Sequence, residues 1–224
     1  MWFWFSGIFS FILFAIPAIP SGTKGSIQFA HYWSRLLLKI NFIKTQKLSE
    51  TSYEPGIVYL SNHASIIDIL VLFKYLPRPF HFVAKDSLFK VPLFGLLMRI
   101  AGFFPLNREN PRRAIQTMSD IADKVKQGHC ILLFPEGTRS QDGSVGEFKS
   151  GFLKILEKSN AKVKMIYIDG TFPLIKKGTL LFWPGKVTIN IGKTILPEQY
   201  QNLSKDDALK FFKQKMIELT AKTI

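Results

Sequence analysis

A histidine and an aspartate, His63 and Asp68, stand five positions apart directly after the short apolar run at residues 57–60. Histidine is the side chain best suited to carry a proton near neutral pH, and a nearby carboxylate can fix its tautomer and stabilise its charged form. On one continuous helix, five residues correspond to about 500°, so the two side chains would diverge by roughly 140°. The pair therefore meets only if the chain turns, with His63 in the turn and Asp68 in the first turn of a helix. A helix cap with an incidental histidine is the alternative that this stretch leaves open.

A second stretch with chemical potential covers residues 134–140 and has the sequence F-P-E-G-T-R-S. It follows another apolar run, residues 130–133, which predicts a buried strand. Pro135 and Gly137 force a loop after that strand. Arg139 carries a planar fork of donors that suits a phosphate group. This strand and loop therefore present Arg139 as a candidate phosphate ligand.

Between these stretches lie Lys85 and two further blocks, V-P-L-F-G at residues 91–95 and G-F-F-P-L-N-R at residues 102–108. Together the blocks resemble the glycerolipid acyltransferase family, specifically the lysophosphatidic acid acyltransferases of phospholipid synthesis. That family is marked by N-H-x-x-x-x-D, a middle block ending in Arg, and F-P-E-G-T-R-S, and all three occur here in this order. The segment 165–170 lacks the proline of the family's fourth block, and Asn107 replaces a frequent acidic residue.

The resemblance implies transfer of a fatty acyl group from an acyl thioester to the free hydroxyl of a lysophosphatidate, giving phosphatidic acid. His63 would remove the hydroxyl proton, and Asp68 would hold the imidazole and stabilise its charged form. The thioester is already activated, so no covalent enzyme intermediate is needed. The donor is an acyl-CoA or an acyl carrier protein, which the residues do not distinguish, and no other cofactor and no metal ion are expected. We expect oxyanion donors among the backbone N–H groups near the start of the helix after His63.

The resemblance also implies a set of substrate-binding residues from the middle and last blocks. These residues are Lys85, Arg108, Glu136, Gly137, Thr138 and Arg139. Arg108 and Arg139 would grip the phosphate, with Lys85 as a weaker candidate. Gly137 lets the backbone approach the acceptor closely. Glu136 either organises its loop or binds the glycerol.

Composition favours a lipid surface as the partner. The 224 residues carry a formal net charge of +14, yet 47% of them are hydrophobic and 14% are aromatic. Proteins that bind nucleic acid are seldom this apolar, whereas a basic and apolar chain suits an anionic bilayer. We therefore expect membrane attachment and no nucleic acid. Two alternatives stay open: an acyltransferase for another lysolipid or a lyso-amino-acid lipid, and a non-enzymatic basic membrane or nucleic-acid-binding protein.

The N-terminal residues 1–43 predict a membrane-anchoring helical pair. Residues 2–19 contain no charged side chain, and Pro17 and Pro20 are expected to end this first helix. Residues 26–43 form a second predicted helix, in which aromatic residues accompany Arg35 and Lys39. We expect the pair to enter or lie along one leaflet, with a single span as the alternative. The cations that follow the apolar segment predict a location on the cytoplasmic face of the inner membrane.

Residues 44–224 predict one α/β acyltransferase domain with a mostly parallel central sheet flanked by helices. The predicted strands are 57–60, 80–84, 103–106, 130–134, 163–168, 180–183 and 186–191. The predicted helices are 65–76, 91–101, 111–127, 149–159 and 204–222. Asn110, Pro111 and Gly128 mark the boundaries of the third helix. Pro184 and Gly185 predict a hairpin-like edge between the last two strands.

The remaining reactive side chains predict structural roles. Cys130 lies within an apolar strand and is expected in the core, and a single cysteine excludes an intramolecular disulfide and a cysteine-based metal cage. His31 and His81 are expected to pack within their own elements. His129, beside a glycine, is expected in a solvated turn.

Overall fold

The computed structural model describes residues 2–18, 22–77 and 79–221, and these residues form a seven-stranded sheet. The strands lie in the order β1-β7-β6-β2-β5-β3-β4. Their bounds are β1 (Ile43–Lys47), β2 (Val58–Ser61), β3 (His81–Lys85), β4 (Phe104–Leu106), β5 (Ile131–Leu133), β6 (Val163–Asp169) and β7 (Gly185–Ile195). Strands β6, β2, β5, β3 and β4 run parallel, β7 runs antiparallel to β6, and β1 runs parallel to β7. The prediction of a mostly parallel sheet is confirmed.

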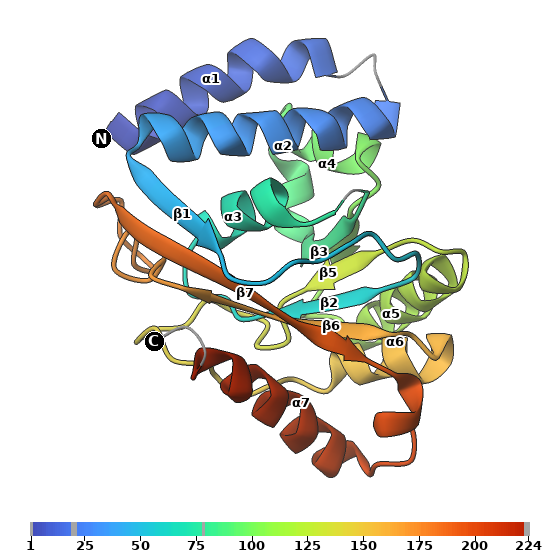
Figure 1. Cartoon of the computed structure of the whole chain (residues 1–224). Coiled ribbons are helices and arrows are strands. Elements are labelled where there is room, and N and C mark those ends of the chain that lie inside the picture. Colours follow the sequence, from blue (N-terminus) through green and yellow to red (C-terminus); the bar gives the residue numbers. More distant parts are fainter. Residues whose placement is uncertain (1, 19–21, 78, 222–224) are drawn as a thin grey trace.

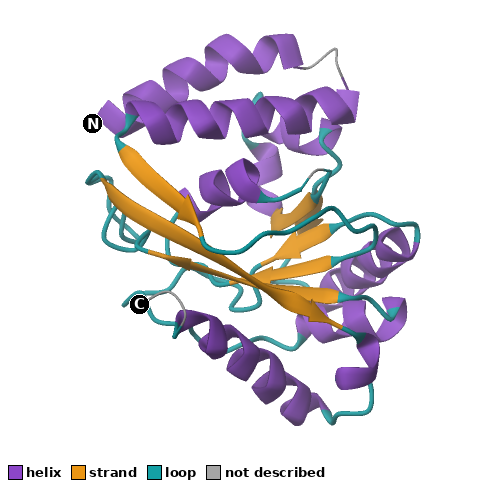
Figure 2. Ribbon diagram, in the orientation of Figure 1, coloured by secondary structure: helices purple, strands orange, loops and turns teal. Residues whose placement is uncertain are grey.

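Helices cover both faces of this sheet (Figure 1). Their bounds are α1 (Trp2–Ala18), α2 (Gly22–Ile40), α3 (Ile67–Tyr75), α4 (Phe94–Ile100), α5 (Pro111–Lys126), α6 (Gly151–Ser159) and α7 (Lys205–Thr220), with short 3-10 turns η1 (Asp86–Lys90) and η2 (Pro197–Gln199). Figure 2 shows α1 to α4 on one side of the sheet and α5 to α7 on the other. Alternation along β2 builds both layers, since Tyr59 packs in the core beneath α3 while Val58 and Leu60 pack against α5, α6 and α7.

Helix α5 follows its sequence signals closely. The side chain of Asn110 accepts a hydrogen bond from the Arg113 N–H, and Pro111 occupies the first helical turn. Gly128 follows the helix with a φ of 90°, a conformation that glycine adopts without strain. The predicted boundaries of this helix are confirmed.

The N-terminal helices form a pair whose inner side joins the core. Leu37 and Leu38 of α2 are buried in the cluster that also contains residues of α3. Helix α2 runs from Gly22 to Ile40, so the predicted range of 26–43 was shifted, because Ile43 already belongs to β1. The first helix continues past Pro17 to Ala18, while Pro20 lies outside the described residues. In the part of the chain that the structure describes, no helix has the length and hydrophobicity required to cross a bilayer.

The predicted strand at 180–183 and the predicted hairpin between it and the next strand were wrong. Residues 180–183 form no strand, and β7 begins at Gly185 and pairs with β6 and β1. The apolar side chains of Leu180, Leu181 and Trp183 are exposed, so their hydrophobicity does not report burial in a sheet. Strand β1 was missed because it is a mainly polar edge strand in which only Ile43 is buried.

His129 is also not a solvated turn residue. Its Nδ1 lies 3.2 Å from Nε2 of His81, which is buried, and Nδ1 of His81 lies 3.0 Å from the Ala101 carbonyl. A carbonyl only accepts, so Nδ1 of His81 donates to it and Nε2 accepts from His129. Burial, together with the neighbouring His129 and Lys124, lowers the pKa of His81. This hydrogen-bond geometry therefore suits a neutral His81 ring.

This pair predicts a loss of stability below neutral pH. The pKa of His81 in the folded chain lies below the value of about 6.5 expected in the unfolded chain. The unfolded state therefore binds more protons, and the free energy of unfolding falls as the pH drops below about 6.5. We expect urea titrations of the wild type between pH 7.5 and 5.5 to show this fall and those of His81→Gln to show less of it. Identical pH slopes in the two proteins would exclude His81 as the source.

Candidate active site

The carboxyl ends of the five parallel strands meet at one edge of the sheet, where open α/β folds place their ligands. His63 follows β2 and the loop of residues 134–140 follows β5. Lys85 ends β3, Arg108 lies just beyond β4, and Thr171 lies just beyond β6. Residues that are far apart in the sequence therefore meet because their strands are parallel neighbours.

His63 and Asp68 meet in the predicted geometry. His63 lies in the turn after β2, Asp68 lies in the first turn of α3, and the His63 Nδ1–Asp68 Oδ2 distance is 2.9 Å. The carboxylate only accepts, so Nδ1 carries the proton and Nε2 keeps a free lone pair. Asp68 is fully buried, while the His63 side chain keeps 15% of its surface exposed. Asp68 thus orients the imidazole through Nδ1, and the His63 side chain remains partly accessible.

Asp68 is held by four hydrogen bonds. Besides His63, its Oδ2 accepts from the backbone N–H groups of Ala64 and Ser65, each at 2.8 Å. Its Oδ1 accepts from the hydroxyl of Thr171 at 2.5 Å. Sequence reasoning missed Thr171, which is buried and follows the apolar run and glycine of residues 165–170. The signal was a hydroxyl residue just beyond the carboxyl end of a central strand.

The hydrogen bonds to Asp68 occupy two backbone donors near His63. The N–H groups of Ala64 and Ser65, in the segment leading into α3, donate to Asp68 and therefore do not serve as oxyanion donors. Two other backbone donors lie near His63. The N–H groups of Thr138 and Arg139 have no hydrogen-bond acceptor within the described residues, and both residues line the cavity beside His63.

Phe134 fixes the plane of the catalytic candidate His63. The two rings stack with their centroids 3.9 Å apart and an interplanar angle of 12°. Phe134 is the first residue of the F-P-E-G-T-R-S block, so this block supports the imidazole as well as the loop beyond it. With Asp68 fixing one ring atom and Phe134 fixing the plane, little freedom of the ring remains.

Glu136 ties the two loops together. One of its carboxylate oxygens accepts from the His63 N–H and the other from the Gly146 N–H, each at 2.9 Å. The His63 carbonyl in turn accepts from the Ser140 N–H at 2.7 Å. Burial raises the pKa of the Glu136 carboxyl, and the two backbone donors oppose that rise. Because Glu136 is buried with both oxygens occupied, the geometry favours its role in organising the loop over contact with glycerol.

Cations gather at the open side of His63. Lys85, Arg108 and Arg139 line the same cavity as His63, together with Gly137 and Thr138. Arg108 donates to the Gly137 carbonyl and so supports the loop as well as the charge. Gly137 has a φ of 71°, which a side chain would strain. Among the described residues that line this cavity there is no carboxylate, so its polar end is cationic.

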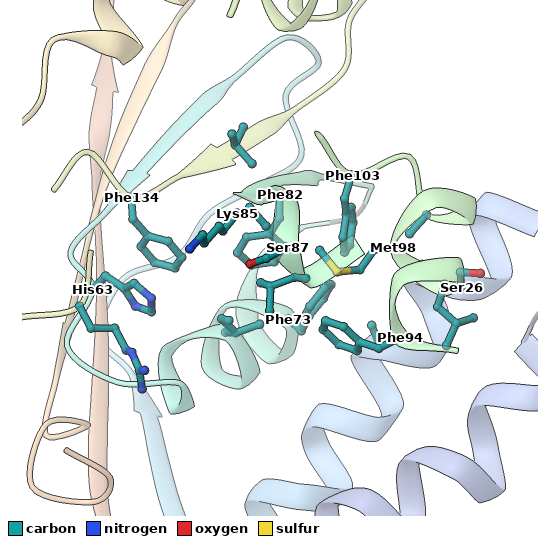
Figure 3. Close-up of a pocket in the computed structure, with 18 of the residues that line it drawn as sticks. Ser26, His63, Phe73, Phe82, Lys85, Ser87, Phe94, Met98, Phe103 and Phe134 are labelled. Carbon is teal, nitrogen blue, oxygen red and sulfur yellow. The ribbon is translucent and has the colours of Figure 1, made fainter. Parts of the chain in front are cut away.

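The cavity itself has a volume of about 370 Å³ and changes character along its length. Figure 3 shows His63, Phe134 and Lys85 at one end, and Phe82, Phe73, Phe103, Met98 and Phe94 leading away toward the N-terminal helices. A second cavity of about 490 Å³, lined almost entirely by apolar side chains, adjoins the first and shares Phe11, Trp33, Ile69 and Phe94 with it. The candidate base His63, the cations and the apolar side chains therefore line one cavity, which adjoins a second apolar cavity.

This arrangement can deprotonate a hydroxyl group that is held beside an anion, next to a long apolar chain. No cluster of three potential metal-ligating side chains occurs among the described residues. The N–H and hydroxyl donors around Asp68 hold its carboxylate in place behind His63, where a negative charge stabilises the imidazolium that forms on proton transfer.

Comparison with known proteins identifies one family and several similar enzymes. The model of the Acyltransferase family matches residues 39–169. A 1-acyl-sn-glycerol-3-phosphate acyltransferase of Chlamydomonas reinhardtii is 36% identical over 147 residues, and a chloroplastic enzyme of the same name from Arabidopsis thaliana is 32% identical over 158 residues. The matches cover 65% and 68% of this chain and 44% of each relative. The chain thus spans less than half of the length of these two relatives.

A solved structure shares the fold. The crystal structure of the 1-acyl-sn-glycerophosphate acyltransferase PlsC from Thermotoga maritima matches with a TM-score of 0.77 at 25% sequence identity. The match covers 90% of this chain and 81% of that chain.

Proposed function

The chain belongs to the Acyltransferase family, and on that premise we propose that it transfers a fatty acyl group from a thioester to the free hydroxyl of lysophosphatidate. The product is phosphatidic acid, and the other product is the free thiol of the donor. The observation that carries the proposal is the His63–Asp68 pair, held at 2.9 Å beside a cationic site and an apolar cavity.

In the proposed mechanism, Nε2 of His63 takes the hydroxyl proton while the hydroxyl oxygen attacks the thioester carbonyl carbon. Asp68 stabilises the imidazolium that forms. The N–H groups of Thr138 and Arg139 donate to the oxyanion of the tetrahedral intermediate. When this intermediate collapses, the carbon–sulfur bond breaks and the imidazolium returns its proton to the leaving thiolate. Apart from the proton that His63 carries, every bond change takes place between the two substrates, and no acyl group is attached to the protein.

Substrate binding follows from the two ends of the cavity. The phosphate of the acceptor lies against Lys85, Arg108 and Arg139, which line the polar end. The acyl chain of the donor extends into the apolar end, where aromatic and aliphatic side chains exclude water. This arrangement brings the thioester carbonyl and the acceptor hydroxyl together next to His63.

The acceptor is an amphiphile, and we propose that α1 and α2 hold the chain against the bilayer that carries it. Helix α1 exposes Trp2, Phe5, Ile8 and Phe9, each with 60–64% of its surface accessible. Exposed positions on α2 include Lys24, Arg35 and Lys39. Apolar and aromatic side chains beside cations are typical of helices that lie in the interface of an anionic membrane.

The direct test is an assay of the purified chain in detergent. Acyl-CoA and acyl carrier protein thioesters are compared as donors, and lysophosphatidate is compared with monoacylglycerol and lysophosphatidylcholine as acceptors. We expect phosphatidic acid from lysophosphatidate with at least one donor, and much slower acylation of the other two acceptors. Failure to acylate lysophosphatidate with either donor would refute the proposal.

Arg139→Ala tests the phosphate site. Loss of a bidentate donor is expected to raise KM for lysophosphatidate about 10- to 100-fold, because hydrogen bonds to charged groups contribute about 1.5–3 kcal/mol. Arg112→Ala is the matched control, since Arg112 is exposed on α5 and does not line the cavity. Equal KM values in the two variants would remove Arg139 from the site.

Thr171→Val tests the support of Asp68. The substitution keeps the shape of the side chain but removes the hydroxyl that donates to Asp68. We expect kcat to fall about 10- to 100-fold with little change in KM, since a hydrogen bond to a charged group contributes about 1.5–3 kcal/mol. Thr171→Ser keeps the donor and should return kcat to within a few fold of the wild type. A purely structural role would instead lower the thermal stability of both variants and leave kcat of the folded fraction unchanged.

A further inference from the structure

The segment between β6 and β7 ends in four consecutive large apolar residues, Leu180 to Trp183. Leu180, Leu181 and Trp183 are 68%, 67% and 63% exposed. Such a cluster is unusual on a surface that faces only water, and it marks a contact with a partner or a membrane. The proposed mechanism makes no use of these three side chains.

Residues 180–183, here called the apolar tip, are held by hydrogen bonds at the base of the segment. The Trp183 N–H donates to the Leu174 carbonyl at 3.0 Å, and the Ser65 hydroxyl donates to the Ile175 carbonyl at 2.8 Å. Leu174 and Ile175 are buried in the core. The tip is therefore presented outward from a fixed base that also contacts the turn before α3.

The tip packs against the start of α1. The indole N–H of Trp4 donates to the Leu180 carbonyl at 2.8 Å, and Phe182 stacks on Phe3 with ring centroids 4.8 Å apart. Figure 1 shows the start of β7 close to the start of α1, at the same end of the molecule. Two segments that are more than 170 residues apart in the sequence thus lie side by side, and each exposes large apolar side chains.

Lysines flank the tip on both sides. Lys176 and Lys177 precede it and Lys186 follows it, all three are exposed, and residues 170–186 contain no Asp or Glu. Lys177 also donates to the Thr138 hydroxyl at 3.0 Å, which links this segment to the loop that lines the cavity. Apolar side chains between cations complement an anionic bilayer, with its hydrocarbon beneath negative headgroups.

We propose that Leu180, Leu181 and Trp183 insert into the interface of an anionic bilayer next to α1. The β6–β7 segment is then a second membrane-contacting element, and its Lys177–Thr138 contact aligns the polar end of the cavity with the headgroups. This inference rests on the proposed membrane attachment of α1, and it adds that attachment is made at two points. Contact at two points fixes the orientation of the chain on the bilayer, because a chain attached by α1 alone could rotate about the axis of that helix.

A site-specific fluorescent label gives the first test. Cys130 is the single cysteine and is buried, so Cys130→Ser combined with Leu181→Cys allows an environment-sensitive dye to be attached at the tip. Ile217→Cys is the matched control, because Ile217 is exposed on α7, on the opposite side of the sheet. With phosphatidylglycerol-containing vesicles, we expect a blue shift and quenching by lipid-borne quenchers at position 181 and neither at position 217.

Three results overturn the proposal. In the first, the dye at position 181 stays in water while the chain sediments with the vesicles. In the second, the dye responds to protein concentration without lipid, which assigns the tip to a contact with a second copy of the chain. In the third, the wild type does not bind the vesicles at all. In the last case the proposed attachment of α1 also fails.

A functional test separates this inference from the proposed reaction. Replacing Leu180, Leu181 and Trp183 by Ser is expected to weaken binding to anionic vesicles at least about tenfold. Turnover of lysophosphatidate embedded in vesicles should fall with it, whereas turnover of a short-chain lysophosphatidate dispersed as monomers should equal that of the wild type. Unchanged vesicle binding by the triple variant contradicts the inference. An inactive wild type contradicts the proposed reaction, and in that case the fluorescence of the dye at position 181 still tests membrane insertion of the tip.

Discussion

His63→Ala is expected to lower kcat for acyl transfer roughly 10²- to 10⁴-fold, the range that a positioned general base contributes. The substitution removes the group proposed to accept the hydroxyl proton. It leaves the backbone of residue 63 in place, where the N–H donates to Glu136 and the carbonyl accepts from Ser140. The thermal unfolding midpoint should therefore stay close to that of the wild type, while initial rates fall.

His129→Ala is the matched control for this prediction. His129 pairs with His81 and does not line the cavity, so its loss should affect stability more than turnover. Substantial activity in folded His63→Ala, within a few fold of the wild type, would assign proton removal to another group. The same loss of activity in both variants would point to a general effect of histidine substitution on the fold.

Asp68→Asn is expected to produce the second large effect, a fall in kcat of roughly 10²- to 10⁴-fold. The amide keeps the volume of the side chain but removes the negative charge that stabilises the imidazolium. It also replaces one acceptor oxygen by an NH₂ group at a carboxylate that accepts four hydrogen bonds. Whichever way the amide turns, at least one of these four donors faces the NH₂ group and loses its acceptor.

Single-turnover rates and KM for lysophosphatidate distinguish this role from binding. We expect the rate of the chemical step to fall and KM to change little, because Asp68 is buried behind His63 and does not line the cavity. Asp206→Asn, on the exposed first turn of α7, should behave like the wild type. A raised KM at unchanged chemical rate would move Asp68 from catalysis to substrate binding.

Much of the site follows from local sequence because its residues lie at strand ends. His63 and Asp68 are linked through one short turn, and their spacing predicts that the two side chains meet only with the turn that the structure has. Lys85, Arg108 and Arg139 come from three different strands, and their meeting depends on strand order. Their convergence was predicted only through the resemblance of the ordered blocks to a known family.

Tertiary contacts account for what the sequence did not reveal. Thr171 reaches Asp68 only because β6 is a neighbour of β2, a long-range pairing without a local signal. The backbone N–H groups of Ala64 and Ser65, which precede α3, donate to Asp68, and residue spacing does not indicate these hydrogen bonds. Residues 180–183 have the composition of a buried strand although three of their side chains, Leu180, Leu181 and Trp183, are exposed, because hydrophobicity does not distinguish a protein core from an apolar surface.

In the proposed reaction, one small site binds both substrates. The cationic end of the cavity would bind the charged headgroup, and the apolar end would exclude water from the thioester. His63 lies at the cationic end, held by Asp68 on one side and stacked on Phe134. Direct transfer between two bound substrates is the reaction that this order of groups supports.

The fate of a labelled acyl group tests the central claim most directly. The purified chain is mixed with lysophosphatidate and a thioester that carries ¹⁴C in its acyl group, and lipid, free acid and protein are separated after rapid quenching. Direct transfer predicts the label in phosphatidic acid, one thiol released for each label transferred, no label on the protein, and product formation slowed roughly 10²- to 10⁴-fold in His63→Ala. Label on the protein, or label released only as free fatty acid, would contradict direct transfer to the lysophosphatidate hydroxyl.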